Sequence, residues 1–155
     1  MSSRKPSRAA RAARLLSSHL TGRDILEIAC GTADFSLAAA ETARGVTAID
    51  LDDCRLSPAA RSTDGVRFQR MDAATLTFPD GSFDTAVLYN ALGHLTAILP
   101  ELLSEALRIP HPGGALIVCS SFSLDKTAME EKLLPLLKER RLSFSCQEEG
   151  PLPYH

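Results

Sequence analysis

The chain has 155 residues, of which 45% are hydrophobic and 23% charged, and its formal net charge is −2 at pH 7. This length predicts a single domain with one sizeable core, and the near balance of charge argues against nucleic acid or a membrane surface as the main partner. No apolar run approaches the roughly 18 residues that would span a bilayer, so we expect a cytoplasmic protein without a membrane span.

The first 20 residues predict a basic helix. An apolar side over 9–20 would let this helix shield a sheet or cover an acceptor pocket. The basic pattern is typical of a solvated helix end, and an organelle address is the alternative. Its cations are Arg4, Lys5, Arg8, Arg11 and Arg14.

The four cysteines form no recognisable metal or redox motif. There is no C-x-x-C pair and no cluster of histidine and cysteine at the spacing of a zinc site. We therefore expect reduced thiols and no metal. The positions are Cys30, Cys54, Cys119 and Cys146.

Short apolar runs then alternate with helical patterns. Strands are predicted at 25–29, 45–50, 66–72, 85–89 and 115–120, and helices at 34–42, 96–109 and 125–141. Such alternation implies a parallel sheet with helices on both faces. Pro135 should kink or split the last helix, a sixth strand is expected from Leu142 to Cys146, and the prolines of 150–155 exclude a central strand there.

The turn after the first strand is built from small residues. Ligands of an open parallel sheet bind beyond the carboxyl ends of its strands, and small side chains allow a close approach to the backbone. A dinucleotide site would carry G-x-G-x-x-G here, whereas Gly31 is the only glycine of the turn, Ala29 to Ala33.

Acidic residues stand at or near the ends of the first three predicted strands. Glu27 would repel a pyrophosphate and attract an ammonium group. Asp50 can accept hydrogen bonds from both hydroxyls of a ribose. Asp72 can accept one from an exocyclic amine, while Leu51 and Ala73 flank an aromatic base. Each acid alone would equally suit a turn or a helix cap, but together they match S-adenosylmethionine, whose sulfonium favours acidic surroundings.

Four segments carry a family resemblance. They are ILEIACGTAD at 25–34, VTAID at 46–50, FQRMDAATLTFPDGSFDTAVL at 68–88 and ALRIPHPGGALIV at 106–118. In order and spacing they resemble the class I S-adenosylmethionine-dependent methyltransferases, and within them the group that includes the ubiquinone and menaquinone C-methyltransferases. The resemblance covers about 24–121.

The resemblance implies a fold and a set of site residues. The fold is a Rossmann-like, doubly wound α/β domain over 1–155, with a mainly parallel sheet of about six strands. The 1–20 segment would be its basic helix, 24–121 its core motifs, and 125–155 its last helix and strand. The implied cofactor-binding residues are Glu27, Ala29, Cys30, Gly31, Asp50, Leu51, Asp72, Ala73 and Tyr89.

The chain also departs from the family pattern. Ala29 and Ala33 replace two usual glycines, and the added methyl group is harmful wherever φ is positive. The link from Leu51 to Gly65 is short for the usual second helix, and no sequence is left for the antiparallel seventh strand. Loss of that strand would leave an open sheet edge, which either the sixth strand or a second copy could cover.

Methyl transfer is an in-line displacement that mainly requires alignment and exclusion of water. Candidate catalytic residues are Tyr89, Asn90 and His94, with His94 as a general base or, alternatively, a packed histidine bonded to backbone. Ser120 and Ser121 could orient the acceptor.

The favoured function is methylation of a small molecule. The alternatives are a catalytically weak or inactive partner module and, less favoured because of Glu27 and the missing glycines, an NAD-dependent oxidoreductase. A nucleic-acid acceptor is not expected, because no N/D-P-P-Y-type sequence follows the fourth strand.

Overall fold

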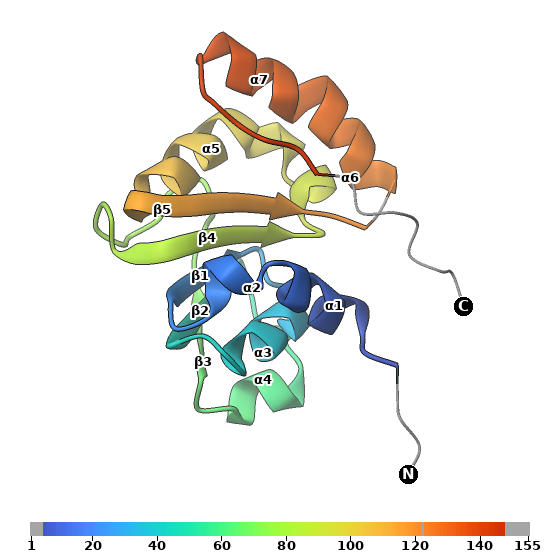
Figure 1. Ribbon diagram of the computed structural model, residues 1–155, viewed down its shortest axis with the longest axis vertical. Coiled ribbons are helices and arrows are strands. Elements are labelled where there is room, and N and C mark those ends of the chain that lie inside the picture. Colours follow the sequence, from blue (N-terminus) through green and yellow to red (C-terminus); the bar gives the residue numbers. More distant parts are fainter. Residues whose placement is uncertain (1–4, 122, 148–155) are drawn as a thin grey trace.

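A computed structural model describes residues 5–121 and 123–147. Its centre is a parallel sheet of five strands in the order β3-β2-β1-β4-β5 (Figure 1). The order reverses between β1 and β4, so the crevice for a ligand is expected beyond the carboxyl ends of these strands. The strands are β1 (Asp24–Ile28), β2 (Gly45–Asp50), β3 (Val66–Arg70), β4 (Phe83–Tyr89) and β5 (Pro110–Cys119).

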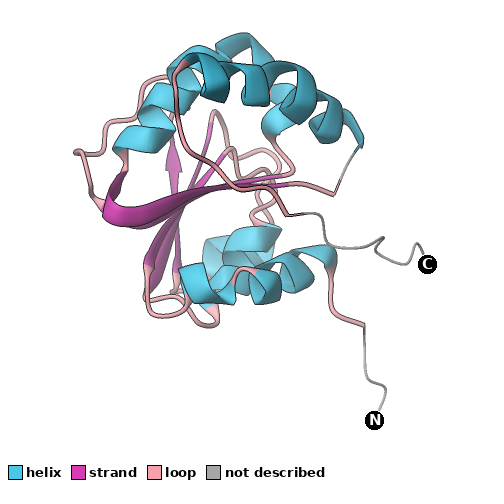
Figure 2. Cartoon of the chain, turned by 45° about the horizontal axis from the view of Figure 1, so that its top comes forward, coloured by secondary structure: helices cyan, strands magenta, loops and turns pink. Residues whose placement is uncertain are grey.

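Helices cover both faces of the sheet, as Figure 2 shows, which confirms the predicted doubly wound architecture. One face carries α1 (Arg8–Leu15), α2 (Ser17–Leu20), α3 (Asp34–Ala40) and α4 (Pro58–Ser62). The other carries α5 (Leu99–Arg108), α6 (Ser123–Ala128), the π turn η3 (Met129–Leu133) and α7 (Leu134–Glu139). Two short 3-10 turns, η1 (Leu92–His94) and η2 (Thr96–Ile98), connect β4 to α5.

The core is divided by the sheet. Leu26 and Ile28 point to the α5 face, where they join Leu102 and Ile109, and all four side chains are fully buried. Ile25 points to the opposite face and packs in the cluster of Phe35 and Ala12. Burial on both faces explains why β1 is almost continuously apolar.

Two helix predictions are refined by the structure. The basic N-terminal helix is interrupted at Leu16, which separates α1 from α2. Pro135 lies in the first turn of α7, directly after the π turn. Because proline cannot donate to the carbonyl four residues earlier, the helix widens before it instead of continuing regularly.

The two ends of the β5 region differ from expectation. β5 begins at Pro110, inside the predicted loop, since a proline is tolerated as the first residue of an edge strand. The predicted sixth strand from Leu142 to Cys146 is wrong, because 142–147 contain no strand and the Leu142 N–H instead donates to the Leu137 carbonyl at 2.9 Å. The five strands of the sheet roughly fit the predicted number of about six, and the described residues contain no antiparallel seventh strand. The expectation for 150–155 lies outside the described residues.

Candidate nucleoside site at the carboxyl edge

The turn from β1 to α3 adopts a strained backbone. Ala29 has a φ of 58° and Ala33 a φ of 66°, and Gly31 between them has a φ of 56°. Glycine visits this left-handed region freely, whereas each alanine there costs roughly 1–2 kcal/mol. Both departures from the family glycines therefore fall where φ is positive and the added methyl group is harmful.

Glu27 lies behind this turn. Its side chain is 1% exposed, and its Oε1 accepts hydrogen bonds from the Ser36 amide at 3.1 Å and the Ser36 hydroxyl at 2.7 Å. Burial raises its pKa to about 8, although the bonds from Ser36 oppose the shift. Glu27 is therefore mostly protonated at neutral pH, and in the free protein it anchors α3 rather than presenting a charge.

Asp50 connects the turn to the end of β2. Its Oδ2 accepts from the Gly31 amide at 2.8 Å, and its Oδ1 accepts from the Leu51 amide at 2.7 Å. The Leu51 side chain that follows is 69% exposed, which is unusual for a large apolar residue. A carboxylate and an apolar side chain thus stand together at the strand end, as a bound nucleoside requires.

A cavity of about 60 Å³ lies beside these residues at the carboxyl edge. It is much smaller than the roughly 300–1,000 Å³ of whole ligand pockets, so it marks only the inner end of a site whose outer side is open at Leu51. At its other side Asp72 accepts from the Ala74 amide through Oδ1 at 2.9 Å. The lining residues are Ala29, Asp50, Leu51, Met71, Asp72, Ala73, Leu95 and Ile98.

The structure thus brings together five of the residues predicted to bind cofactor, namely Ala29, Asp50, Leu51, Asp72 and Ala73. Gly31 adjoins them through its bond to Asp50. Cys30 instead packs into a core cluster under the turn.

Tyr89 also lies away from this cavity. It stacks on Phe35 with ring centroids 5.2 Å apart, in the cluster on the α3 face of the sheet. Sequence reasoning missed Leu95, between η1 and η2, and Ile98, at the end of η2. Both line the cavity although they lie more than 20 residues from Asp72, and no local pattern signals that contact.

The catalytic candidates surround the end of β4. Asn90 has a φ of 51°, and its Oδ1 accepts from the Ser121 amide at 2.7 Å while its Nδ2 donates to the Ser121 hydroxyl at 3.1 Å. His94 is exposed in η1. Burial is the main cause of the raised pKa of Tyr89. Of the three, His94 is the side chain most open to solvent.

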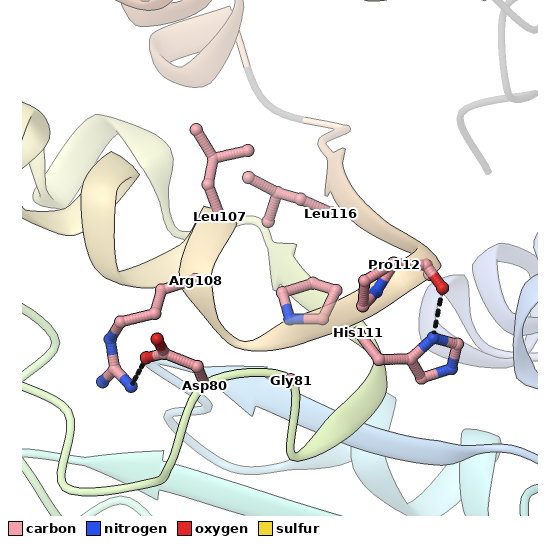
Figure 3. A pocket seen from close by; sticks show the side chains of 9 residues that line it. Asp80, Gly81, Leu107, Arg108, His111, Pro112 and Leu116 are labelled. Atoms are coloured by element: carbon pink, nitrogen blue, oxygen red, sulfur yellow. Dashed lines mark hydrogen bonds and ion pairs between the residues drawn. The ribbon is translucent and has the colours of Figure 1, made fainter.

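A second cavity, of about 520 Å³, lies at the amino end of the sheet (Figure 3). Its polar side chains are bonded within the protein. Arg108 pairs with Asp80 at 2.8 Å and Glu105 at 2.6 Å, and His111 contacts the Pro112 carbonyl and Asp84. Although larger, this cavity is lined by polar side chains that already have ion-pair or hydrogen-bond partners within the protein.

Other classes of site receive no support. Within the residues described, no helix is long and apolar enough to cross a membrane, and no group of three or more histidine, cysteine or acidic side chains could hold a metal ion. All four cysteines are free thiols, as predicted.

Comparison with known proteins agrees with this arrangement. A family model described as a methyltransferase domain matches residues 25–114. A Mycolicibacterium smegmatis protein described as a probable S-adenosylmethionine-dependent methyltransferase is 30% identical over 141 residues, which cover 90% of this chain and 48% of that protein. A demethylmenaquinone methyltransferase of Thermus thermophilus is 32% identical over 126 residues, covering 73% and 57% respectively.

A solved structure is similar as well. Phosphoethanolamine N-methyltransferase 1 of Haemonchus contortus, in complex with phosphoethanolamine and S-adenosylhomocysteine, superposes with a TM-score of 0.62 at 28% identity, covering 75% of this chain and 26% of that one. The chain spans about half the length of the curated relatives it matches. The matched model covers more than half of the chain and includes the turn, Asp50 and Asp72, and the chain therefore belongs to the methyltransferase domain family.

Proposed function

We propose that the chain binds S-adenosylmethionine at the carboxyl edge and transfers its methyl group to a small-molecule acceptor. The observation that carries this proposal is that Asp50 and Asp72 line one cavity without a cation within 4.0 Å of either carboxylate in the described part of the chain. Two carboxylates without an ion-pair partner among the described residues favour a ligand that carries a sulfonium and an ammonium group. The Arg55 guanidinium lies over Gly31 nearby but pairs with neither carboxylate.

The residues present suit the nucleoside part of this cofactor. Each oxygen of Asp50 accepts one amide N–H and has a further lone pair for a ribose hydroxyl. Asp72 uses Oδ1 for the Ala74 amide, and among the described residues no bond engages Oδ2, which can accept from an exocyclic amine. Leu51 and Leu95 supply apolar surface for the faces of the base.

Few residues of the chain need to take part directly in methyl transfer. When bound, the cofactor supplies an electrophilic methyl group. Asn90, held by Ser121, can orient the acceptor, and the exposed His94 imidazole can take a proton from an acceptor hydroxyl. The N-terminal helix α1 packs its Ala9 and Ala12 against the α3 face, so shielding the sheet is the role its contacts support.

The direct test is a binding and transfer experiment. Calorimetric titration should give heat with S-adenosylhomocysteine and none with NAD. Incubation with methyl-labelled donor should then label one member of a metabolite panel, in which the names of the relatives justify including demethylmenaquinone. Binding of NAD alone would contradict the proposal.

A non-catalytic partner module is the second candidate. The positive φ of both Ala29 and Ala33 favours it, because the methyl groups strain the turn that faces the ligand. The two functions separate cleanly. An inactive module would bind S-adenosylhomocysteine weakly or not at all and would label no acceptor.

We also propose that two copies pair through β5. No charge and no proline occurs from Ala115 to Ser121, although edge strands are usually protected by such residues. The Cys119 carbonyl accepts from the Asn90 amide, directly after β4, at 2.9 Å, so the backbone groups of the preceding residue, Val118, point to the open edge. A twofold axis there would pair the two strands antiparallel without repulsion between like charges.

Val118→Pro tests this pairing, because it removes a donor from the open edge and none from the ladder with β4. We expect a dimer for the native chain and a monomer for the variant by light scattering. Val118→Ala, which keeps the N–H, is the matched control and should stay dimeric. A monomeric native chain would refute the pairing.

A cytoplasmic location is proposed as well. Its support is that all four cysteines are unpaired, since free thiols are typical of reducing compartments. Fractionation of cells that express a tagged chain would check it.

A further inference from the structure

Asp125 is a buried acid that sequence reasoning did not consider. It lies in the first turn of α6 and is 2% exposed. Its Oδ1 accepts from the Gly93 amide at 2.7 Å, and its Oδ2 accepts from the Ser120 hydroxyl at 2.7 Å. One side chain thus joins η1, the end of β5 and α6.

Such an arrangement is costly unless both oxygens are used. A carboxylate taken out of water loses several kcal/mol of hydration, which only well-formed hydrogen bonds offset. Both bonds of Asp125 are short, as expected for a charged acceptor. The acid therefore favours one arrangement of its two partners.

A second bridge reinforces the first. Asn90 and Ser121 exchange bonds of 2.7 Å and 3.1 Å, and the Asn90 amide donates to the Cys119 carbonyl at 2.9 Å. The segment 90–93 is consequently held at both of its ends, by the bonds of Asn90 to Cys119 and Ser121 and by the bond of Gly93 to Asp125 of α6.

This segment continues directly into the wall of the nucleoside cavity. The amides of His94, Leu95 and Ile98 each donate to the carbonyl three residues before them, at 3.0, 3.0 and 3.1 Å. Hydrogen-bonded turns of this kind fix the positions of the lining residues Leu95 and Ile98 relative to Gly93. The position of Gly93 therefore determines the positions of Leu95 and Ile98 in the cavity wall.

We propose that Asp125 is a positioning residue for nucleoside binding, which acts through the Gly93 amide to hold Leu95 and Ile98 against the base. The inference rests on the proposed function, because it assigns the cavity to the adenosine part of the cofactor. It requires no contact between Asp125 and the ligand.

Asp125→Ala tests the role by titration with two ligands, S-adenosylhomocysteine and 5′-methylthioadenosine. Both ligands carry adenosine and only the first carries the amino-acid group. The variant should therefore lower the affinity for both ligands by a similar factor, about tenfold. Asp125→Asn should bind close to the native level, because its Oδ1 still accepts from Gly93 and its Nδ2 can donate to Ser120.

Asp84→Ala is the matched control. Asp84 also bridges separate strands, accepting from the Asp24 amide at 2.7 Å and pairing with His111 at 2.6 Å, but at the opposite edge of the sheet. We expect Asp84→Ala to lower the melting temperature and to leave both affinities unchanged. If Asp125 were merely structural, Asp125→Ala would give this same result.

The outcomes separate the two levels of the proposal. A native chain that binds neither ligand would overturn the nucleoside site itself. A native chain that binds, together with a folded Asp125→Ala that binds equally well, would overturn only the role of Asp125. If Asp125→Ala does not fold, Asp125→Leu takes its place, since a leucine is similar in size and makes neither bond. Affinity weakened by a few-fold supports the inference, and unchanged affinity refutes it.

Discussion

The two edges of the sheet treat acidic side chains differently. At the amino edge three acids pair with basic side chains: Asp24 with Arg44, Asp84 with His111, and Asp80 with Arg108. At the carboxyl edge Asp50 and Asp72 accept from backbone amides instead. These three acids of the amino edge have ion pairs, whereas Asp50 and Asp72 have none within the described residues, although the Arg55 guanidinium lies over Gly31 nearby.

The boundary between the two behaviours is sharp. Asp53, only three residues beyond Asp50, pairs with Arg61 at 3.1 Å and Arg70 at 3.3 Å. Asp53 is therefore neutralised by two arginines, whereas Asp50, which lines the cavity, has no ion pair in the part of the chain that the structure describes. The contrast indicates that charge at a strand end is informative only once its partners are known.

The largest expected effect concerns the buried acid of the carboxyl edge. Burial raises the pKa of Glu27 from 4.5 to about 8, so its contribution to stability is complete below pH 4.5 and is lost as pH rises to 8. Glu27→Gln keeps an acceptor for Ser36 and removes this loss. We expect the free energy of unfolding of the variant, relative to that of the native chain, to increase with pH by on the order of 1 kcal/mol per pH unit at most.

Chemical denaturation at several pH values between 5 and roughly 8.5 measures this gain. Glu41→Gln, at the exposed end of α3, is the control and should leave the pH profile unchanged. Parallel profiles for Glu27→Gln and the native chain would show that Glu27 does not titrate in this window.

The next effect tests the open charge directly. Asp50→Ala should weaken the binding of S-adenosylhomocysteine by about 1–3 kcal/mol, the scale for loss of a charged hydrogen-bond partner. Asp80→Ala, its counterpart at the amino edge, should leave calorimetric affinity unchanged. Equal affinities for Asp50→Ala and the native chain would remove Asp50 from the site.

A smaller effect concerns the strained turn. Ala29→Gly relieves a positive φ and should stabilise the fold by about 1 kcal/mol, while widening the cavity that Ala29 lines. Ala38→Gly, inside α3, should instead destabilise by about 1 kcal/mol. Thermal melts of both variants give the comparison, and a destabilised Ala29→Gly would mean that the turn is not strained.

The smallest effect belongs to the amino edge. Bonds to the Pro112 carbonyl and to Asp84 raise the pKa of His111 above 6.5. The pair therefore contributes fully below that pH and loses its contribution as pH rises through the raised value. In the native chain we expect a small, salt-sensitive fall in melting temperature as pH rises through the raised pKa of His111, and His111→Gln should remove this fall. A fall that persists in the variant would assign it to another group.

The strand positions and the two acids of the site were predictable from local pattern. Apolar runs bounded by turn residues predicted β1, β2 and β4 closely, because burial on both faces demands such runs. Parallel strands end at a common edge, so the strand pattern by itself places Asp50 and Asp72 near each other. Both line the cavity.

Tertiary structure decided the rest. The inward turn of Glu27 and the reach of Leu95 depend on packing against neighbours distant in the chain. The positive φ of Ala29 and the bridge from Asp125 to Gly93 likewise arise only once β1, β4 and β5 are side by side. Sequence determines which residues can stand at a strand end, since backbone periodicity is local, but the partner of each side chain is chosen by contacts across the fold.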